Sequence, residues 1–128
     1  MTGVSLPTVD RTSLRCALRL VSEANSREHW GKKAKRAKTQ RQAIWAEWLR
    51  LGKPTVPPPC VVTITRIAPR VMDCDNLQRA AKAVRDAVAE HVIGADDGDA
   101  RIQWRYEQRA QKPKTYAVDV VIEGTIDA

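Results

Sequence analysis

Four short stretches of the chain either alternate between apolar and polar residues or are apolar throughout, and both patterns predict β-strands. Residues 14–20 place leucines and a cysteine on one side and arginines on the other. Residues 60–68 are β-branched and apolar on both faces, which predicts a strand in the centre of a sheet. Residues 101–108 and 115–123 alternate again across a short loop, so we expect them to close the fold as a hairpin.

Two other stretches repeat their apolar residues at helical spacing. The first follows a sequence similar to a capping box, ends at Gly52, and carries a stripe made of Trp30, Ala34, Ala37, Ile44 and Trp48. The second runs from about residue 75 to 92, and its expected core face holds Leu77, Ala80, Ala81, Val84, Ala87 and Val88. The element order is therefore β-α-β-α-β-β. It predicts one α+β domain over residues 1–128, a mixed sheet covered by helices.

Length and composition narrow the class of protein. A chain of 128 residues is expected to form a single domain, and no run of 18 apolar residues predicts a membrane span. The N-terminus lacks the basic and then apolar pattern of a signal peptide. Cys16, Cys60 and Cys74 are widely spaced and form no C-x-x-C pair. We expect reduced cysteines and a cytoplasmic protein.

Charge is unevenly distributed along the chain, whose formal net charge is +7. Residues 1–72 hold 14 Lys and Arg against 4 Asp and Glu, whereas residues 73–99 hold 3 against 7. A basic surface attracts the phosphate backbone of nucleic acids. The residues expected to contact DNA are Arg27, Lys32, Lys33, Lys35, Arg36 and Arg70. A nucleic-acid partner alone does not explain the compact acidic segment.

The acidic segment places several charges on one helix face. At 100° per residue, Asp75, Arg79, Lys82 and Asp86 fall within about 60° of one another, and Asp73 points the same way on the extended chain before them. Clustered carboxylates favour a hard divalent cation such as Mg²⁺. Simpler interpretations exist for single residues, because Asp75 could be a helix N-cap and Asp86 or Asp99 could be merely solvated.

The sequence from "DCDNLQRAAKAVRDAV" to "GADDGD" resembles the RusA-type Holliday junction resolvases, whose hallmark is D-x-D-N-L, a helical Lys and a later D-D pair. The resemblance implies a homodimeric, Mg²⁺-dependent endonuclease that cuts four-way DNA junctions. It also implies that Asp73, Asp75 and Asp97 hold the metal and that Asp96 supports them. This helix has three extra residues, so the family Lys corresponds to Lys82 or Arg79. Lys82 is preferred because it keeps the K-x-x-x-D spacing to Asp86.

Two other functions fit parts of the sequence. A non-catalytic, basic DNA-binding protein of the same fold would have the same charge excess, with its aspartates simply solvated. A nucleotide-sugar transferase would share D-x-D and Mg²⁺, but the chain is short for a second substrate site and its net charge is positive. The preferred mechanism is hydrolysis at a phosphate held beside Mg²⁺, with Lys82 offsetting transition-state charge.

Overall fold

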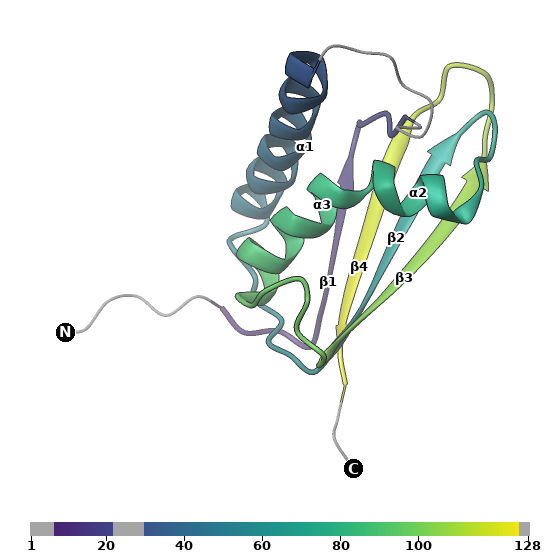
Figure 1. Ribbon diagram of the computed structural model, residues 1–128. Helices are drawn as coiled ribbons and strands as arrows, with labels where there is room; N and C mark the ends of the chain where they lie inside the picture. Colours follow the sequence, from purple (N-terminus) through teal and green to yellow (C-terminus); the bar gives the residue numbers. More distant parts are fainter. Residues whose placement is uncertain (1–6, 22–29, 126–128) are drawn as a thin grey trace.

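Four strands form one mixed sheet in a computed structural model that describes residues 7–21 and 30–125. The strand order is β1 (Arg11–Cys16), β4 (Ala117–Gly124), β2 (Cys60–Ala68) and β3 (Ile102–Ala110) (Figure 1). β4 is antiparallel to both of its neighbours, and β2 is parallel to β3. The mixed sheet and the central position of the 60–68 strand are therefore confirmed.

The predicted hairpin between the last two strands is wrong. β4 lies between β1 and β2 and does not pair with β3; the register places Ile64 opposite Val120 on one side and opposite Tyr106 on the other. The inward side chains explain which strand is central. Those of β4 are fully buried, whereas Trp104 and Tyr106 of β3 are only partly buried, as suits an edge strand.

The first strand has the predicted face but different ends. β1 covers Arg11–Cys16 rather than 14–20, although Leu14, Cys16, Leu18 and Leu20 are all buried as expected. The Leu18 amide donates to the Cys16 carbonyl at 2.8 Å, so the chain turns away from its neighbour there. Alternation predicted which side chains enter the core, but not where backbone pairing stops.

All the helical segments cover the same face of the sheet (Figure 1). They are α1 (Trp30–Arg50), α2 (Cys74–Ala80), α3 (Lys82–Ala87) and a π-helical turn, η1 (Val88–Ile93). The single helix predicted over 75–92 is divided at Ala81, where φ is −92° and ψ is 2°. Its core face is confirmed, because all six apolar residues assigned to it are buried.

The predicted apolar stripe of α1 is confirmed only in part. Ile44 and Trp48 are buried, but Trp30 is 75% exposed. α1 packs on β1 and α3, and its first turns extend past both (Figure 1), so side chains there have no core to enter. Gly52 follows the helix with φ +88°, which confirms the predicted stop.

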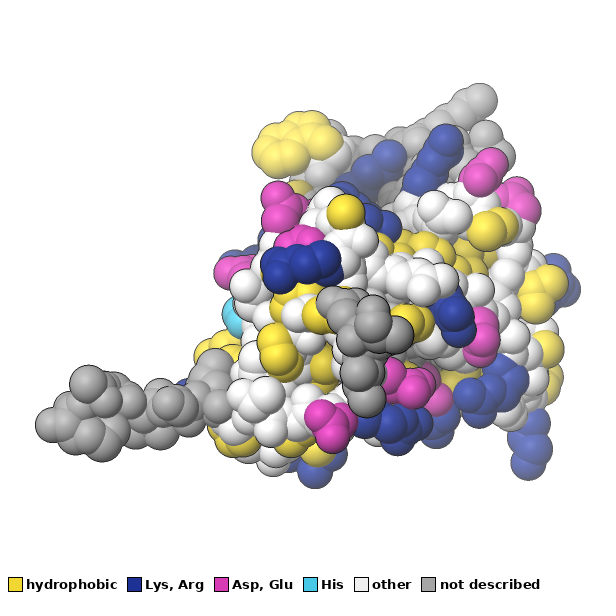
Figure 2. Space-filling model, turned by 90° about the horizontal axis from the view of Figure 1, so that it is seen from below, with side chains coloured by type: hydrophobic (Ala, Val, Ile, Leu, Met, Phe, Trp, Pro, Cys, Tyr) yellow, Lys and Arg dark blue, Asp and Glu magenta, His cyan; other side chains and the backbone are white. Residues whose placement is uncertain are grey.

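The face of the sheet away from the helices carries charges of both signs. Asp119 of β4 is ion-paired with Arg15 of β1 at 2.5 Å and with Arg109 of β3 at 3.5 Å. The end of the molecule where β4 finishes also mixes basic with acidic side chains (Figure 2). None of the helices in the described part of the chain is long and apolar enough to cross a membrane.

Candidate active site on the second helix

The D-x-D pair lies where the chain enters α2. Asp73 is the N-cap, with its two carboxylate oxygens accepting hydrogen bonds from the Asn76 backbone amide at 2.9 Å and from Asn76 Nδ2 at 3.0 Å. Asp75 lies in the first turn, is exposed, and pairs with no side chain among the described residues. The capping role considered for Asp75 therefore belongs to Asp73, and capping leaves Asp75 unexplained.

Lys82 joins two carboxylates beside α3. Its Nζ is 2.9 Å from Asp86 Oδ1 and 2.9 Å from Asp97 Oδ2. The hydrogen bond to Asp97, followed by that to Asp86, raises the pKa of Lys82 above its ordinary value. The hydrogen bond from Lys82 in turn lowers the pKa of Asp97. At neutral pH the group is thus an ammonium ion between two carboxylates, which suits charge stabilisation rather than proton abstraction.

Arg85, which was not among the predicted site residues, fixes Asp97 from the other side. Its Nε donates to Asp97 Oδ2 at 2.9 Å and its Nη2 donates to the Asp97 carbonyl at 3.0 Å. Its guanidinium also donates to the Tyr106 hydroxyl and lies 4.6 Å from the Trp104 ring centroid. The three-residue steps from Arg79 to Lys82 to Arg85 place Arg85 beside these cations on the helix, but they do not predict its contact with Asp97.

The turn after η1 gives each of its aspartates a different role. Gly94, with φ +77°, ends the helical segment, and its amide donates to the Ala89 carbonyl at 2.8 Å. Asp96 accepts a hydrogen bond from the Gly98 amide, so it stabilises the turn that presents Asp97. Asp99 pairs with Arg101 at 2.8 Å, and this lowers the pKa of Asp99 to about 2. Asp99 is therefore structural.

A hollow of about 540 Å³ opens between α2–α3 and β3. Its lining residues are Gln78, Arg79, Lys82, Arg85, Asp97 and Tyr106. Both candidates for the family Lys, Arg79 and Lys82, thus border the same hollow. Of these two cations, Lys82 is bonded to Asp97, whereas the Arg79 side chain makes no hydrogen bond or ion pair within the described ranges.

The three predicted metal ligands do not converge. Among the described residues, no three His, Cys, Asp or Glu side chains are placed to hold one metal ion. Asp97 is instead bonded to Lys82 and Arg85 of α3, whereas Asp73 and Asp75 lie at the start of α2. The ligand assignment of Asp97 stays a prediction. The donor chemistry of Asp73 and Asp75 does fit Mg²⁺, which is often held by one or two carboxylates together with water.

The predicted DNA-contacting residues fall in different places. Lys33 and Arg36 border a groove between α1 and α2–α3, while Lys32 and Lys35 are exposed on α1 outside it. Arg70 follows β2, only three residues before Asp73, and borders a hollow with Arg66 of β2 and with Arg19. Arg27 lies outside the described residues. Basic side chains therefore lie on two sides of the acidic site.

Comparison with known proteins adds no assignment. No protein-family model and no curated protein sequence matches the chain.

Proposed function

We propose that the protein is a Mg²⁺-dependent, structure-selective endodeoxyribonuclease that resolves four-way DNA junctions as a homodimer. The observation that carries this proposal is the exposed Asp75 at the start of α2, unpaired among the described residues and followed by two exposed cations, Arg79 of α2 and Lys82 of α3. A structural role accounts for Asp73 and Asp99 but not for this combination. The proposed substrate, a four-way DNA junction, comes from the resemblance of D-x-D-N-L, the helical cation and the D-D pair to the RusA-type resolvases.

The reaction is hydrolysis of a phosphodiester. Water attacks phosphorus, the bond to the 3′ oxygen breaks, and the products are a 5′-phosphate and a 3′-hydroxyl. Asp73 and Asp75 would hold Mg²⁺, which when bound supplies positive charge beside the phosphate and makes its water more acidic. Lys82, kept protonated by Asp97 and Asp86, offsets negative charge that builds on the phosphoryl group.

Symmetry of the substrate supports a dimer. Resolution of a four-way junction requires matched cuts in two strands, and a twofold dimer presents two equivalent sites. The basic residues flanking the site would hold the backbone without reading its sequence.

A non-catalytic DNA-binding protein of the same fold is the second candidate. It is favoured by one observation, the ion pairs of Asp97 with Lys82 and Arg85, which leave that carboxylate neutralised. On this interpretation the aspartates serve the fold and its solubility.

Digestion of a synthetic four-way junction distinguishes the two candidates. The nuclease proposal predicts paired cuts near the branch point in the presence of Mg²⁺. It predicts no cutting in a chelator, and no cutting of linear duplexes made from the same strands. Binding of the junction with no cutting at any Mg²⁺ concentration would favour the second candidate.

A further inference from the structure

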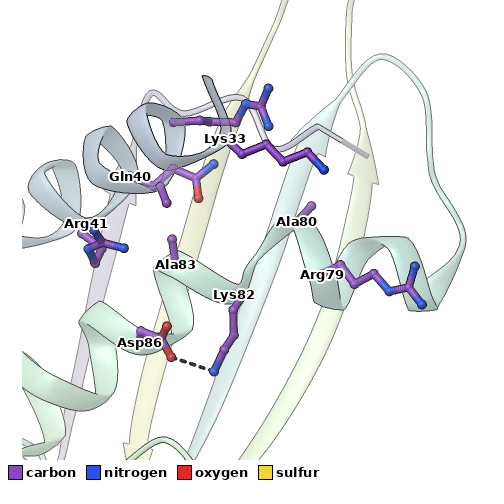
Figure 3. Close-up of a pocket in the computed structure, with 10 residues that line it drawn as sticks. Lys33, Gln40, Arg41, Arg79, Ala80, Lys82, Ala83 and Asp86 are labelled. Atoms are coloured by element: carbon purple, nitrogen blue, oxygen red, sulfur yellow. Dashed lines mark hydrogen bonds and ion pairs between the residues drawn. The ribbon is translucent and has the colours of Figure 1, made fainter. Parts of the chain in front are cut away.

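The groove between α1 and α2–α3 gathers positive charge from both of its walls (Figure 3). Its volume is about 290 Å³, and alanines at positions 37, 80 and 83 leave it open. The cations that border it are Lys33, Arg36 and Arg41 from α1 and Arg79 and Lys82 from the opposite wall. Residues as distant in sequence as 33 and 82 are thus brought to one small space by the packing of α1 on α3.

Three of these cations have no compensating partner among the described residues. Asp86 is the only acidic residue among the described ones that borders the groove, and it is already bonded to Lys82. The side chains of Lys33, Arg41 and Arg79 have no hydrogen bond or ion pair to any residue that the structure describes. Like charges that border one groove repel one another, so an anion in the groove would relieve that repulsion.

Gln40 provides an independent indication of a ligand. The residue is only 4% exposed, and its amide points from α1 into the groove (Figure 3). Within residues 7–21 and 30–125 that amide has no hydrogen-bond partner. Thr55 Oγ1 is the one fully buried side-chain nitrogen or oxygen atom among the described residues that lacks a partner, so the unpaired Gln40 amide keeps a small accessible area through which a ligand in the groove could be bound. Its NH₂ group would gain a partner if an anionic oxygen occupied the groove.

We propose that this groove seats a phosphodiester group of the DNA strand, at a position separate from Asp73 and Asp75. The inference rests on the proposed function for the identity of its partner. Phosphate oxygens accept hydrogen bonds from guanidinium, ammonium and amide groups together, which is the set of donors present. Arg79 and Lys82 border both this groove and the hollow that contains Asp97, so a strand seated here continues past the candidate active site.

Two double variants of equal charge test the groove. Lys33→Gln with Arg41→Gln removes groove cations, whereas Lys38→Gln with Lys112→Gln removes exposed cations outside it. Binding of a fluorescent four-way junction is measured in chelator over a range of salt concentrations. The groove variant should flatten the plot of log affinity against log salt by about one unit for each phosphate that it no longer neutralises, and the control should lie near wild type. Equal weakening of junction binding in both variants would refute the proposal that the groove seats a phosphodiester group.

Nuclear magnetic resonance of the Gln40 side-chain amide identifies the ligand. Its signals should move saturably with a single-stranded oligonucleotide, at far lower concentration than with inorganic phosphate, and remain unchanged in sodium chloride of equal ionic strength. The exposed Gln42 of the same helix is the internal control. If inorganic phosphate saturates the Gln40 shift at a lower concentration than the oligonucleotide does, the groove does not bind a DNA strand. If neither ligand shifts the Gln40 signals more than sodium chloride does, the groove is not an anion site. Neither binding readout requires cleavage, so an inactive protein that still binds through the groove would refute only the proposed nuclease.

Discussion

At the scale of single residues, the coupling of Lys82 to Asp97 distinguishes Lys82 from Arg79. The two side chains meet at 2.9 Å, and the bond lowers the pKa of Asp97. We therefore predict that Lys82→Met raises the pKa of Asp97 towards the ordinary value for an aspartate. Arg79→Met should leave it nearly unchanged, because Arg79 has no bond to Asp97. Carbon-detected titration of the Asp97 carboxyl group measures both effects.

The same shift has a consequence for stability. A carboxylate whose pKa is lower in the folded state stabilises the fold above its ordinary, unfolded pKa, and this contribution is lost as pH falls through the folded value. Unfolding by urea should therefore show a smaller loss of stability below about pH 4 in Lys82→Met than in the wild type. An identical acid profile in the two proteins would mean that this ion pair is absent in solution.

Arg85 shows which contacts a sequence pattern misses at this scale. Helical periodicity correctly put Asp75, Arg79, Lys82 and Asp86 on the outward side of the helix. It could not reveal that Arg85 would meet Asp97, because that contact depends on a turn twelve residues later. Neighbouring side chains on one helix were predictable from the sequence, whereas contacts between that helix and the later turn were not.

At the scale of elements, Asp73 combines a structural role with a proposed chemical one, and two substitutions separate them. Asp73→Ala removes the cap of α2 and should lower the free energy of unfolding by about 1 kcal/mol. Asp73→Asn should fold almost as stably as wild type, because Asn is an equally good cap. The amide is a poorer Mg²⁺ ligand, so Asp73→Asn should still cut junctions much more slowly. Urea denaturation and a cleavage assay on the same samples give both quantities. Full activity in Asp73→Asn would leave this residue only its capping role.

The sequence predicted which segments are strands and which are helices, but it did not predict which elements pair or pack together. The apolar run of 60–68 requires burial on two sides, so its central position followed from composition. Alternation in 115–123 says that one face is buried but does not say against which strand, and so β4 was wrongly paired with β3. Likewise, helical spacing placed Trp30 on the apolar stripe, but its burial depended on how far the neighbouring elements extend.

At the scale of the whole molecule, the proposed function requires two active sites acting together. We predict a twofold dimer in solution at the concentrations at which junctions are cut. Light scattering after size-exclusion chromatography should give a mass near twice the chain mass of 14.3 kDa, both in chelator and in Mg²⁺. A monomer at every concentration that supports cleavage would contradict paired resolution, although it would still permit single nicks.

If the α2 carboxylates form a nuclease centre, as we propose, cleavage by Asp75→Asn should be strongly impaired. Asp75 lies in the first turn of α2, so its replacement should cost only about 0.3 to 1 kcal/mol of helix-dipole interaction. Glu90→Gln is the matched control, because it removes one exposed negative charge from the same helical region outside the site. Single-turnover cleavage of a four-way junction in Mg²⁺ should fall about 100-fold or more in Asp75→Asn and stay near wild type in Glu90→Gln. Junction binding by Asp75→Asn should persist or tighten. Near wild-type cutting by folded Asp75→Asn would mean that the α2 carboxylates do not form a nuclease centre.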